Sequence, residues 1–294
     1  MVEPLAHRAS LFAGDWLANR EPADHAARSS DLTQRLVRWI MTRSPQAEVY
    51  QMLDLGCGTG SNMRYLAPRL PGGQAWTLVD HDPGHLEAAD RLCKELPGVS
   101  SFATRLQRLE EGLGVAIPDE TDVVTGSALL DLVSGDWLEN LAARADEISA
   151  AVLFTLSYSG DFLLSPMLED DGWILRAVNE HQRSEKGSGR ALGPDAWFQC
   201  AQAFEPRGYH VFSAPSAWVL GEPLRNLQVQ LFEGWAEAAA EQRPNEAGRA
   251  DAWLTQRLKL LDDVASETRV FHQDVLALPD DAATSPVKDG ARPV

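Results

Sequence analysis

The sequence is short of positive charge. Its 26 lysines and arginines stand against 43 aspartates and glutamates, which gives a formal net charge of −17 at pH 7. So acidic a chain repels phosphate backbones and anionic lipid surfaces. The charge therefore argues against general nucleic-acid binding and against binding to anionic membranes, although it leaves room for a small local basic site.

Cysteines and long apolar runs are scarce as well. The three cysteines are odd in number and scattered, which is typical of reduced thiols in a cytoplasm rather than of a disulfide framework. No CxxC pair or histidine–cysteine cluster predicts a metal site. The longest apolar run, 150–156, is too short to cross a bilayer, and charged residues interrupt the N-terminal segment where a signal peptide needs an apolar core. We therefore expect a cytoplasmic protein without a metal, either a monomer or a homodimer.

The most informative segment is 52–60, which reads Met-Leu-Asp-Leu-Gly-Cys-Gly-Thr-Gly. The apolar stretch that leads into it from Val49 is too short for an independent helix and is typical of a buried parallel strand. Glycines at alternate positions then give a turn whose backbone can approach a ligand, since no Cβ stands in the way. A helix that begins near Ser61 would point free N–H groups at the same ligand. A strand, glycine turn and helix in this order hold a nucleotide-like molecule at the carboxyl end of a sheet.

The spacing of the glycines narrows the identity of that molecule. A dinucleotide fingerprint needs Gly-x-Gly-x-x-Gly and a P-loop needs Gly-Lys-Ser/Thr, and the segment has neither pattern. It instead resembles the first motif of class I S-adenosylmethionine-dependent methyltransferases, and the resemblance covers about 30–160. It implies that the acid holds the ammonium group of S-adenosyl-L-methionine while the turn lies under the ribose and methionine parts. The cofactor-binding residues that it implies here are Asp54, Gly56, Cys57, Gly58 and Gly60.

A second acid lies where Rossmann-type sites bind a ribose. Residues 75–80 read as a short strand that ends in Asp80, and Asp82-Pro83 then starts a helix. Asp80 follows the glycine turn by about twenty residues, the usual spacing of the ribose-binding acid. Its carboxylate can accept two charge-assisted hydrogen bonds from a cis-diol. We expect Asp80 to bind the ribose with His81 beside the ligand; the alternative is an acid that merely ends a strand.

Four further residues complete the expected cofactor site. The resemblance implies an acid near the end of strand three that binds adenine, but residues 106–109 read Leu-Gln-Arg-Leu. We therefore expect backbone groups or Gln107, next to Arg108, to hold the adenine. Ser127 follows strand four in the crevice where ligands bind. Because N-terminal helices in this family often cover the cofactor, Arg28 is the candidate to clamp its carboxylate; a solvated surface arginine is the alternative.

The predicted fold class is α/β. Short apolar segments alternate with helical ones as far as 156, which predicts a Rossmann-like doubly wound parallel sheet. The resemblance implies seven strands, mostly parallel, with an antiparallel last strand. We expect the pair 210–214 and 217–220 to close this sheet.

The additions to the sheet are expected at both ends of the chain. The predicted domains are an N-terminal helical lid (1–30, broken near Pro22), a methyltransferase domain (31–221, with an acceptor-site insertion at 157–193), C-terminal helices (222–278, near 224–242 and 247–272) and a disordered tail (279–294).

The residues that act on an acceptor are harder to identify, because methyl transfer from a sulfonium is an in-line displacement that needs mainly alignment and desolvation. A base to remove a proton is sometimes required. The expected catalytic residues are His181, whose charge changes near neutral pH, Asp131 and Tyr158. A helix-capping role for Asp131 is an equal alternative.

Basic side chains gather after strand five. The stretch 181–190 holds four side chains that can be basic, together with glycines. It could fold over an anionic acceptor such as a carboxylate or phosphate, although a solvated loop is the common reading of a charge run. The expected substrate-binding residues are Arg183, Lys186 and Asp161. Five tryptophans are expected to pack in the core rather than to form a cage for a cation: Trp173, Trp197, Trp218, Trp235 and Trp253.

The predicted activity is transfer of a methyl group from S-adenosylmethionine to a small-molecule acceptor. DNA and RNA amino-methyltransferases carry Asn/Asp-Pro-Pro-Tyr after strand four, and this chain has Ser-Ala-Leu-Leu there. One alternative is another enzyme that uses an adenosyl ligand on the same fold, and a second is a non-catalytic subunit that binds a partner protein. The intact glycine motif and Asp80 disfavour the second alternative.

Overall fold

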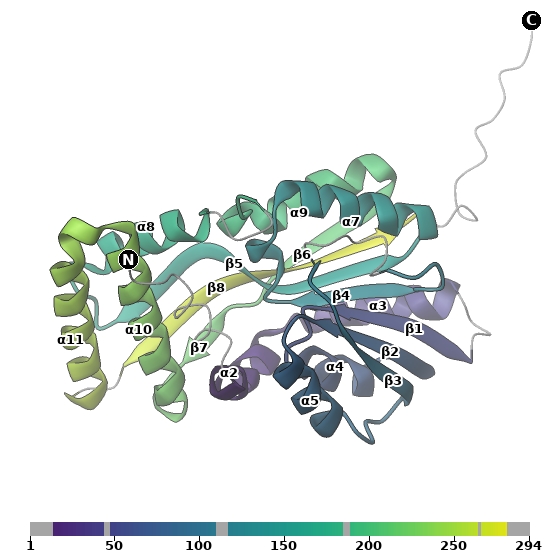
Figure 1. The fold of residues 1–294 in the computed structure, drawn as a ribbon, viewed down its shortest axis with the longest axis horizontal. Helices are drawn as coiled ribbons and strands as arrows, with labels where there is room; N and C mark the ends of the chain where they lie inside the picture. The colour runs from purple at the N-terminus through teal and green to yellow at the C-terminus, as the bar shows by residue number, and fades with distance from the viewer. Residues whose placement is uncertain (1–13, 44–47, 110–116, 185–188, 264–265, 281–294) are drawn as a thin grey trace, which may run out of the picture.

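The computed structural model describes residues 14–43, 48–109, 117–184, 189–263 and 266–280 (Figure 1). Seven strands form a sheet in the order β3-β2-β1-β4-β5-β8-β6, and β7 joins it by pairing with β8. Neighbours run parallel except at β8, which is antiparallel to β5, β6 and β7. The strands are Val49–Leu55 (β1), Gly73–Asp80 (β2), Val99–Leu106 (β3), Val123–Ser127 (β4), Ala151–Ser165 (β5), Tyr209–Pro215 (β6), Trp218–Leu220 (β7) and Glu267–Pro279 (β8).

This arrangement confirms the predicted fold, which is a mostly parallel α/β sheet with an antiparallel last strand. Helices precede the sheet at the N-terminus, and further helices lie in the C-terminal part of the chain. The helices are Gly14–Ala27 (α2), Ser30–Arg43 (α3), Ser61–Leu66 (α4), Pro83–Leu92 (α5), Gly135–Ile148 (α7), Asp171–Gln182 (α8), Ala196–Phe204 (α9), Arg225–Gln242 (α10) and Ala247–Asp263 (α11). Short 3₁₀ turns lie at 67–69, 130–132, 193–195, 205–207, 222–224 and 244–246.

Helices cover both faces of the parallel part of the sheet (Figure 1). On one face, α3, α4 and α5 bury residues such as Leu36, Met63 and Leu86 against β1 and β2. On the other face, α7 and α9 bury residues such as Leu141 and Phe204 against β1, β4 and β5. Burial from both sides explains why these strands read as continuous apolar runs.

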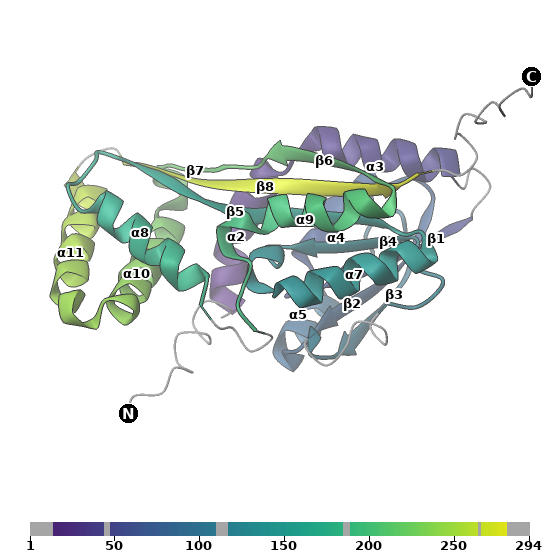
Figure 2. The same ribbon diagram turned by 90° about the horizontal axis from the view of Figure 1, so that it is seen from above.

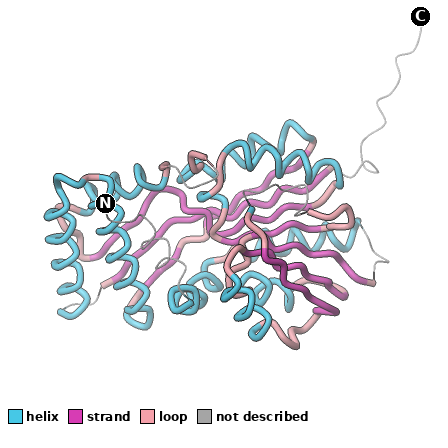
Figure 3. The backbone as a smooth tube through the Cα atoms, viewed as in Figure 1, coloured by secondary structure: helices cyan, strands magenta, loops and turns pink. Residues whose placement is uncertain are grey.

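A third apolar cluster lies beyond the parallel part, and we call this region the extension. Here β5, β7 and β8 continue toward α8, α10 and α11 (Figure 2), and α2 packs against the same cluster. In the tube drawing the long strands run without a break from the parallel part into the extension (Figure 3). Phe162 of β5 stacks on Trp235 of α10 with ring centroids 4.1 Å apart.

Two predictions for the C-terminal part are wrong. The helix expected near 247–272 ends at Asp263, and 267–279 form β8, which lies between β5 and β6. As a result β7 pairs with β8 instead of closing the sheet with β6, and α10 and α11 stand between two strands of the sheet. The physical reason is that β8 buries the polar side chains Thr268, His272 and Asp274, which hide the alternation of a strand.

The break predicted near Pro22 is also wrong, because α2 runs through it as one helix. A proline inside a helix removes one backbone hydrogen bond. Trp16 and Ala23 of α2 are buried in the extension, and Arg20 pairs with Asp24 one turn further on at 2.9 Å. These contacts offset the lost bond. The remaining parts of the predicted lid and tail, 1–13 and 281–294, lie outside the described residues.

Candidate active site

The glycine turn follows β1 directly. Its three glycines have positive φ angles, up to +81° at Gly60, a region that side chains disfavour. A Cβ at Gly60 would lie 2.5 Å from the Cys93 sulfur, so only glycine fits there. Cys57 is buried in the turn, its N–H donates to the Val79 carbonyl at 3.0 Å, and burial raises the pKa of its thiol.

Asp54 ends β1 beneath this turn and is 0% exposed. Its Oδ1 accepts hydrogen bonds from Asn62 Nδ2 at 2.6 Å and from Thr125 Oγ1 at 2.8 Å. Its Oδ2 is buried and has no partner among the described residues. Burial raises the pKa of Asp54 to about 6, although the two hydrogen bonds and the Arg28 charge act in the opposite direction.

Arg28 lies at the junction of α2 and α3 and is buried. Its Nη1 donates to Asn62 Oδ1 at 2.6 Å, and its guanidinium carbon stands 4.3 Å from the centre of the Tyr65 ring. The Nε and Nη2 atoms are buried without a partner in the described part of the chain. Burial lowers the pKa of Arg28, while the charges of Asp274, Tyr65 and Asp54 oppose that shift. Asn62 thus links Arg28 to Asp54, and Arg28 is buried beside the motif instead of being the solvated surface arginine of the alternative.

Asp80 ends β2 and faces the same turn. Its Oδ2 accepts from the Gly58 N–H at 2.8 Å and its Oδ1 from the Asp82 N–H at 2.9 Å. The rings of His81 and His85 lie 3.4 and 3.5 Å from Oδ1. Burial alone would raise the pKa of Asp80, but hydrogen bonds from His85 and from the two backbone groups hold it below its usual value. Asp82 caps α5 as expected, accepting from the Gly84 N–H at 2.7 Å.

The other expected cofactor residues are placed less closely. Gln107 donates its backbone N–H to the Asp80 carbonyl at 2.9 Å, so it lies beside the end of β2. Arg108 is exposed. Ser127 is half-buried at the end of β4.

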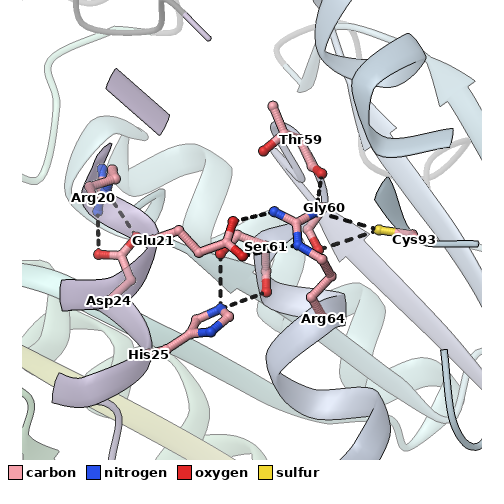
Figure 4. A network of polar contacts seen from close by, with 9 residues as sticks. All are labelled: Arg20, Glu21, Asp24, His25, Thr59, Gly60, Ser61, Arg64 and Cys93. Carbon is pink, nitrogen blue, oxygen red and sulfur yellow. Dashed lines mark hydrogen bonds and ion pairs between the residues drawn. The ribbon is translucent and has the colours of Figure 1, made fainter. Parts of the chain in front are cut away.

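A polar network fastens α2 to the glycine turn (Figure 4). Arg64 of α4 donates from Nε to Glu21 at 3.0 Å and from Nη1 to the Thr59 carbonyl at 2.5 Å. His25 Nε2 lies 3.1 Å from Ser61 Oγ. The Cys93 thiol lies 3.6 Å from the Gly60 carbonyl. The N-terminal helix α2 is therefore held against the glycine turn by polar contacts of two of its side chains, Glu21 and His25.

Asp274 of β8 lies near Arg28, although no motif or spacing in the sequence indicates a role for it. It is 1% exposed, and it accepts from the Ser29 N–H and from the Leu156 N–H at 2.8 Å each. The first contact fixes the chain next to Arg28, and the second fixes an irregular point of β5 where Leu156 has a φ of +57°. A strand that was expected to be a helix thus holds the arginine in place.

The three expected catalytic residues meet in one pocket. Asp131, Tyr158 and His181 line a cavity of about 180 Å³ that lies between α2, β5, β7, α8 and α10. The same cavity is lined by Trp16, Trp218, Trp235 and His272, and we call it the tryptophan pocket. Trp218 and Trp235 are buried in the apolar cluster of the extension, as expected for core residues, and also form part of this wall.

The basic stretch after α8 pairs with acids of the chain itself. His181 Nε2 lies 3.1 Å from Glu241 Oε2, and Arg183 Nη2 lies 3.0 Å from Asp195 Oδ2. Asp161 is exposed. Lys186 lies outside the described residues. Arg183 and Asp161 do not line the tryptophan pocket.

The sequence predicts neither a metal-binding group nor a membrane-spanning helix, and the described residues contain neither. No group of three or more histidine, cysteine or acidic side chains in that part of the chain is arranged to hold a metal ion. None of its helices combines the length and the apolar character that a membrane span requires.

Part of the chain matches a known family model. Residues 52–150 match the family model described as a methyltransferase domain. No curated protein sequence matches the chain. The solved structures to which the chain is similar include a cyclopropane synthase from Mycobacterium tuberculosis, with 14% identity, a TM-score of 0.44 and coverage of 94% of this chain and 100% of that one.

Two further solved structures show a comparable likeness. Phosphoethanolamine N-methyltransferase 2 from Haemonchus contortus has 14% identity and a TM-score of 0.45, with coverage of 94% of this chain and 61% of that one. A methyltransferase from Geobacter sulfurreducens in complex with S-adenosyl-L-homocysteine has 12% identity and a TM-score of 0.43, with coverage of 90% and 98%.

Proposed function

Because residues 52–150 are a class I S-adenosylmethionine-dependent methyltransferase domain, we propose that the chain transfers the methyl group of this cofactor to a small molecule. The cofactor would lie over the glycine turn, between the ends of β1 and β2. The acceptor would lie in the tryptophan pocket.

The proposal rests on two buried side chains of opposite charge, each of which has atoms without a hydrogen-bond partner. Asp54 Oδ2 has no hydrogen bond among the described residues, and neither do Arg28 Nε and Nη2. Buried polar atoms are rarely left unpaired. The methionine end of the cofactor carries an ammonium and a carboxylate, so one ligand complements both groups. The residues present therefore fit S-adenosylmethionine.

Asp80 would hold the ribose. Its carboxylate accepts two backbone N–H groups and stays ionised because its pKa is lowered. Carboxylate oxygens can each accept more than one hydrogen bond, which leaves capacity for the hydroxyls of a ribose. His81, next to it, would lie beside the same sugar. Gln107, bonded to the Asp80 carbonyl, would lie near the adenine.

The chemistry needs little from the protein beyond alignment. The cofactor supplies a methyl carbon that bonds to the acceptor as its bond to sulfur breaks. α2 excludes water from the turn through its network with α4. Tyr158 is a poor base, since burial raises the pKa of its hydroxyl. A proton released by the acceptor would therefore pass to Asp131 or His181, which share the pocket with it.

Titration calorimetry with S-adenosylmethionine and S-adenosylhomocysteine tests this proposal. Arg28→Gln should weaken the binding of both by about 1.5–3 kcal/mol, the range for a hydrogen bond to a charged group. Arg38→Gln, an exposed position on α3, is the matched control and should bind like the unchanged chain. If neither compound binds the unchanged chain, the scaffold alternative replaces the proposal.

A further inference from the structure

The tryptophan pocket lies one side chain away from the glycine turn. A Cβ at Gly56 would lie 3.2 Å from Leu129 Cδ1, and a Cβ at Gly58 would lie 3.3 Å from Leu17 Cδ1. Their chain neighbours, Ala128 and Trp16, line the pocket. The glycine turn is therefore next to two side chains, Leu129 and Leu17, whose chain neighbours form part of the pocket wall.

Aromatic rings form much of the lining of the pocket. Trp16 and Trp218 lie with ring centroids 6.5 Å apart, and Trp218 lies 5.0 Å from the ring of His272. Tyr158 meets His272 edge-on at 6.3 Å. Aromatic walls in such tilted and edge-on arrangements bind a planar ring by the same contacts that they make with one another.

Two side chains at the pocket that can be basic, Arg20 and His181, are paired with acids of the chain. Arg20 pairs with Asp24 and lies over the rings of Trp16 and Trp218, at 5.9 and 5.0 Å. His181 pairs with Glu241. A cationic acceptor would meet the guanidinium on the aromatic faces, and an anionic one would find that guanidinium taken by a carboxylate.

Two ionisable groups in the wall report the same preference. Burial lowers the pKa of His272 to about 3, with the Arg20 charge adding to the effect. Burial raises the pKa of Tyr158, with Asp161 and Asp131 adding to it. One group would become positive and the other negative, and both are held in the neutral form. Burial therefore disfavours a charge on either of these two rings.

Resting on the proposed function, we propose that the acceptor is an uncharged single aromatic ring with small substituents, bound in the tryptophan pocket between Trp16, Trp218 and Trp235. The size agrees: the pocket measures about 180 Å³, and an apolar cavity of about 150 Å³ holds benzene. This replaces the anionic acceptor expected from the basic stretch at 181–190.

Four probes of similar size test the inference: benzyl alcohol, benzoate, benzylamine and cyclohexylmethanol. Each is titrated by saturation-transfer NMR at pH 7 into the chain saturated with S-adenosylhomocysteine. Benzyl alcohol should bind at least about tenfold more tightly than the two charged probes, because burial of an unpaired charge is costly. It should also bind more tightly than the non-planar cyclohexylmethanol.

A pair of matched variants ties the binding to this pocket. Ala238→Leu adds bulk to the pocket wall on α10 and should abolish the binding of benzyl alcohol. Ala252→Leu makes the same change at an exposed position of α11 and should leave it unchanged. Thermal melting of both variants checks that they are folded.

The outcomes separate the two proposals. Failure of S-adenosylhomocysteine to bind overturns the proposed function. If it binds, but benzyl alcohol does not bind, is matched by any of the other probes, or binds Ala238→Leu normally, the inference about the acceptor is overturned and the cofactor site stands.

Discussion

The parallel part of the sheet and the extension build their binding surfaces from opposite materials. Around the glycine turn, Asp54, Asp80 and Arg28 bring buried charge to the ends of β1 and β2. In the extension, tryptophan rings and neutral His272 line the pocket. The first surface suits a ligand with charged groups at fixed places, and the second suits a neutral ring. Under the two proposals, one continuous sheet would hold two ligands of different polarity next to each other.

The largest effect should come from crowding the glycine turn. Gly60 and Gly208 share a φ near +80°, but a Cβ at Gly60 meets the Cys93 sulfur at 2.5 Å, whereas a Cβ at Gly208 meets nothing within 4 Å. Gly60→Ala should cost about 2–5 kcal/mol of unfolding free energy from backbone strain and overpacking. Gly208→Ala, just before β6, should cost only the strain, about 1–2 kcal/mol. Urea unfolding of both variants measures the difference; equal losses would mean that the turn has room for a side chain.

Asp274 connects the two regions through its hydrogen bonds to Ser29 and Leu156, so its substitution should lower both the stability of the protein and its affinity for the cofactor. Asp274→Asn leaves one acceptor oxygen for the Ser29 and Leu156 N–H groups, so one buried donor loses its partner at a cost of about 1–3 kcal/mol. The variant also weakens the contact that holds Ser29, the neighbour of Arg28, so S-adenosylhomocysteine should bind more weakly in calorimetry. Asp251→Asn, exposed on α11, is the control. Unchanged cofactor affinity in Asp274→Asn would separate β8 from the cofactor site.

The pH dependence of cofactor binding sharpens the contrast, since only the charged surface should titrate. Binding of an ammonium favours ionised Asp54, whose pKa is about 6, so affinity for S-adenosylhomocysteine should fall about tenfold from pH 7 to pH 5. Asp54→Asn should bind weakly and without this dependence. A wild-type affinity that is flat between pH 7 and pH 5 would contradict the assignment.

The same pKa sets the sign of a smaller effect on the protein without ligand. The folded pKa of Asp54 lies above its value in an unfolded chain, about 3.9. The stability that its protonated form contributes is therefore present below about pH 4 and lost as the pH rises through about 6. Thermal melting of the unliganded Asp54→Asn variant should lack this decline.

The sequence predicts well which residues meet at the glycine turn, because this part of the structure is local. Asp54, the glycines and Asp80 stand in two short strand-and-turn segments, so their proximity follows from parallel strands that end at one edge. Arg28 is a long-range prediction whose burial beside Asn62 supports it. Its role as a clamp, like the other residue roles, stays a prediction.

The extension could not be predicted in the same way. The tryptophan pocket draws on α2, β5, β7, α8, α10 and β8, and no local pattern brings these together. β8 was missed because Thr268, His272 and Asp274 face inward. Polar side chains at buried positions obscure the period of two, and they are the ones that fix Ser29 and Leu156 and line the pocket.

The position of β8 has a consequence for the order of folding. It lies between β5 and β6 although it follows both in the chain by many residues. During synthesis, β6 cannot join the sheet until β8 (Glu267–Pro279) has left the ribosome, because β8 is the strand that lies between β5 and β6. The sheet is therefore completed late. Pairings across such long sequence separations slow folding and leave strand edges exposed meanwhile. We therefore expect the nascent chain to expose the edges of β5 and β6 until β8 has been made.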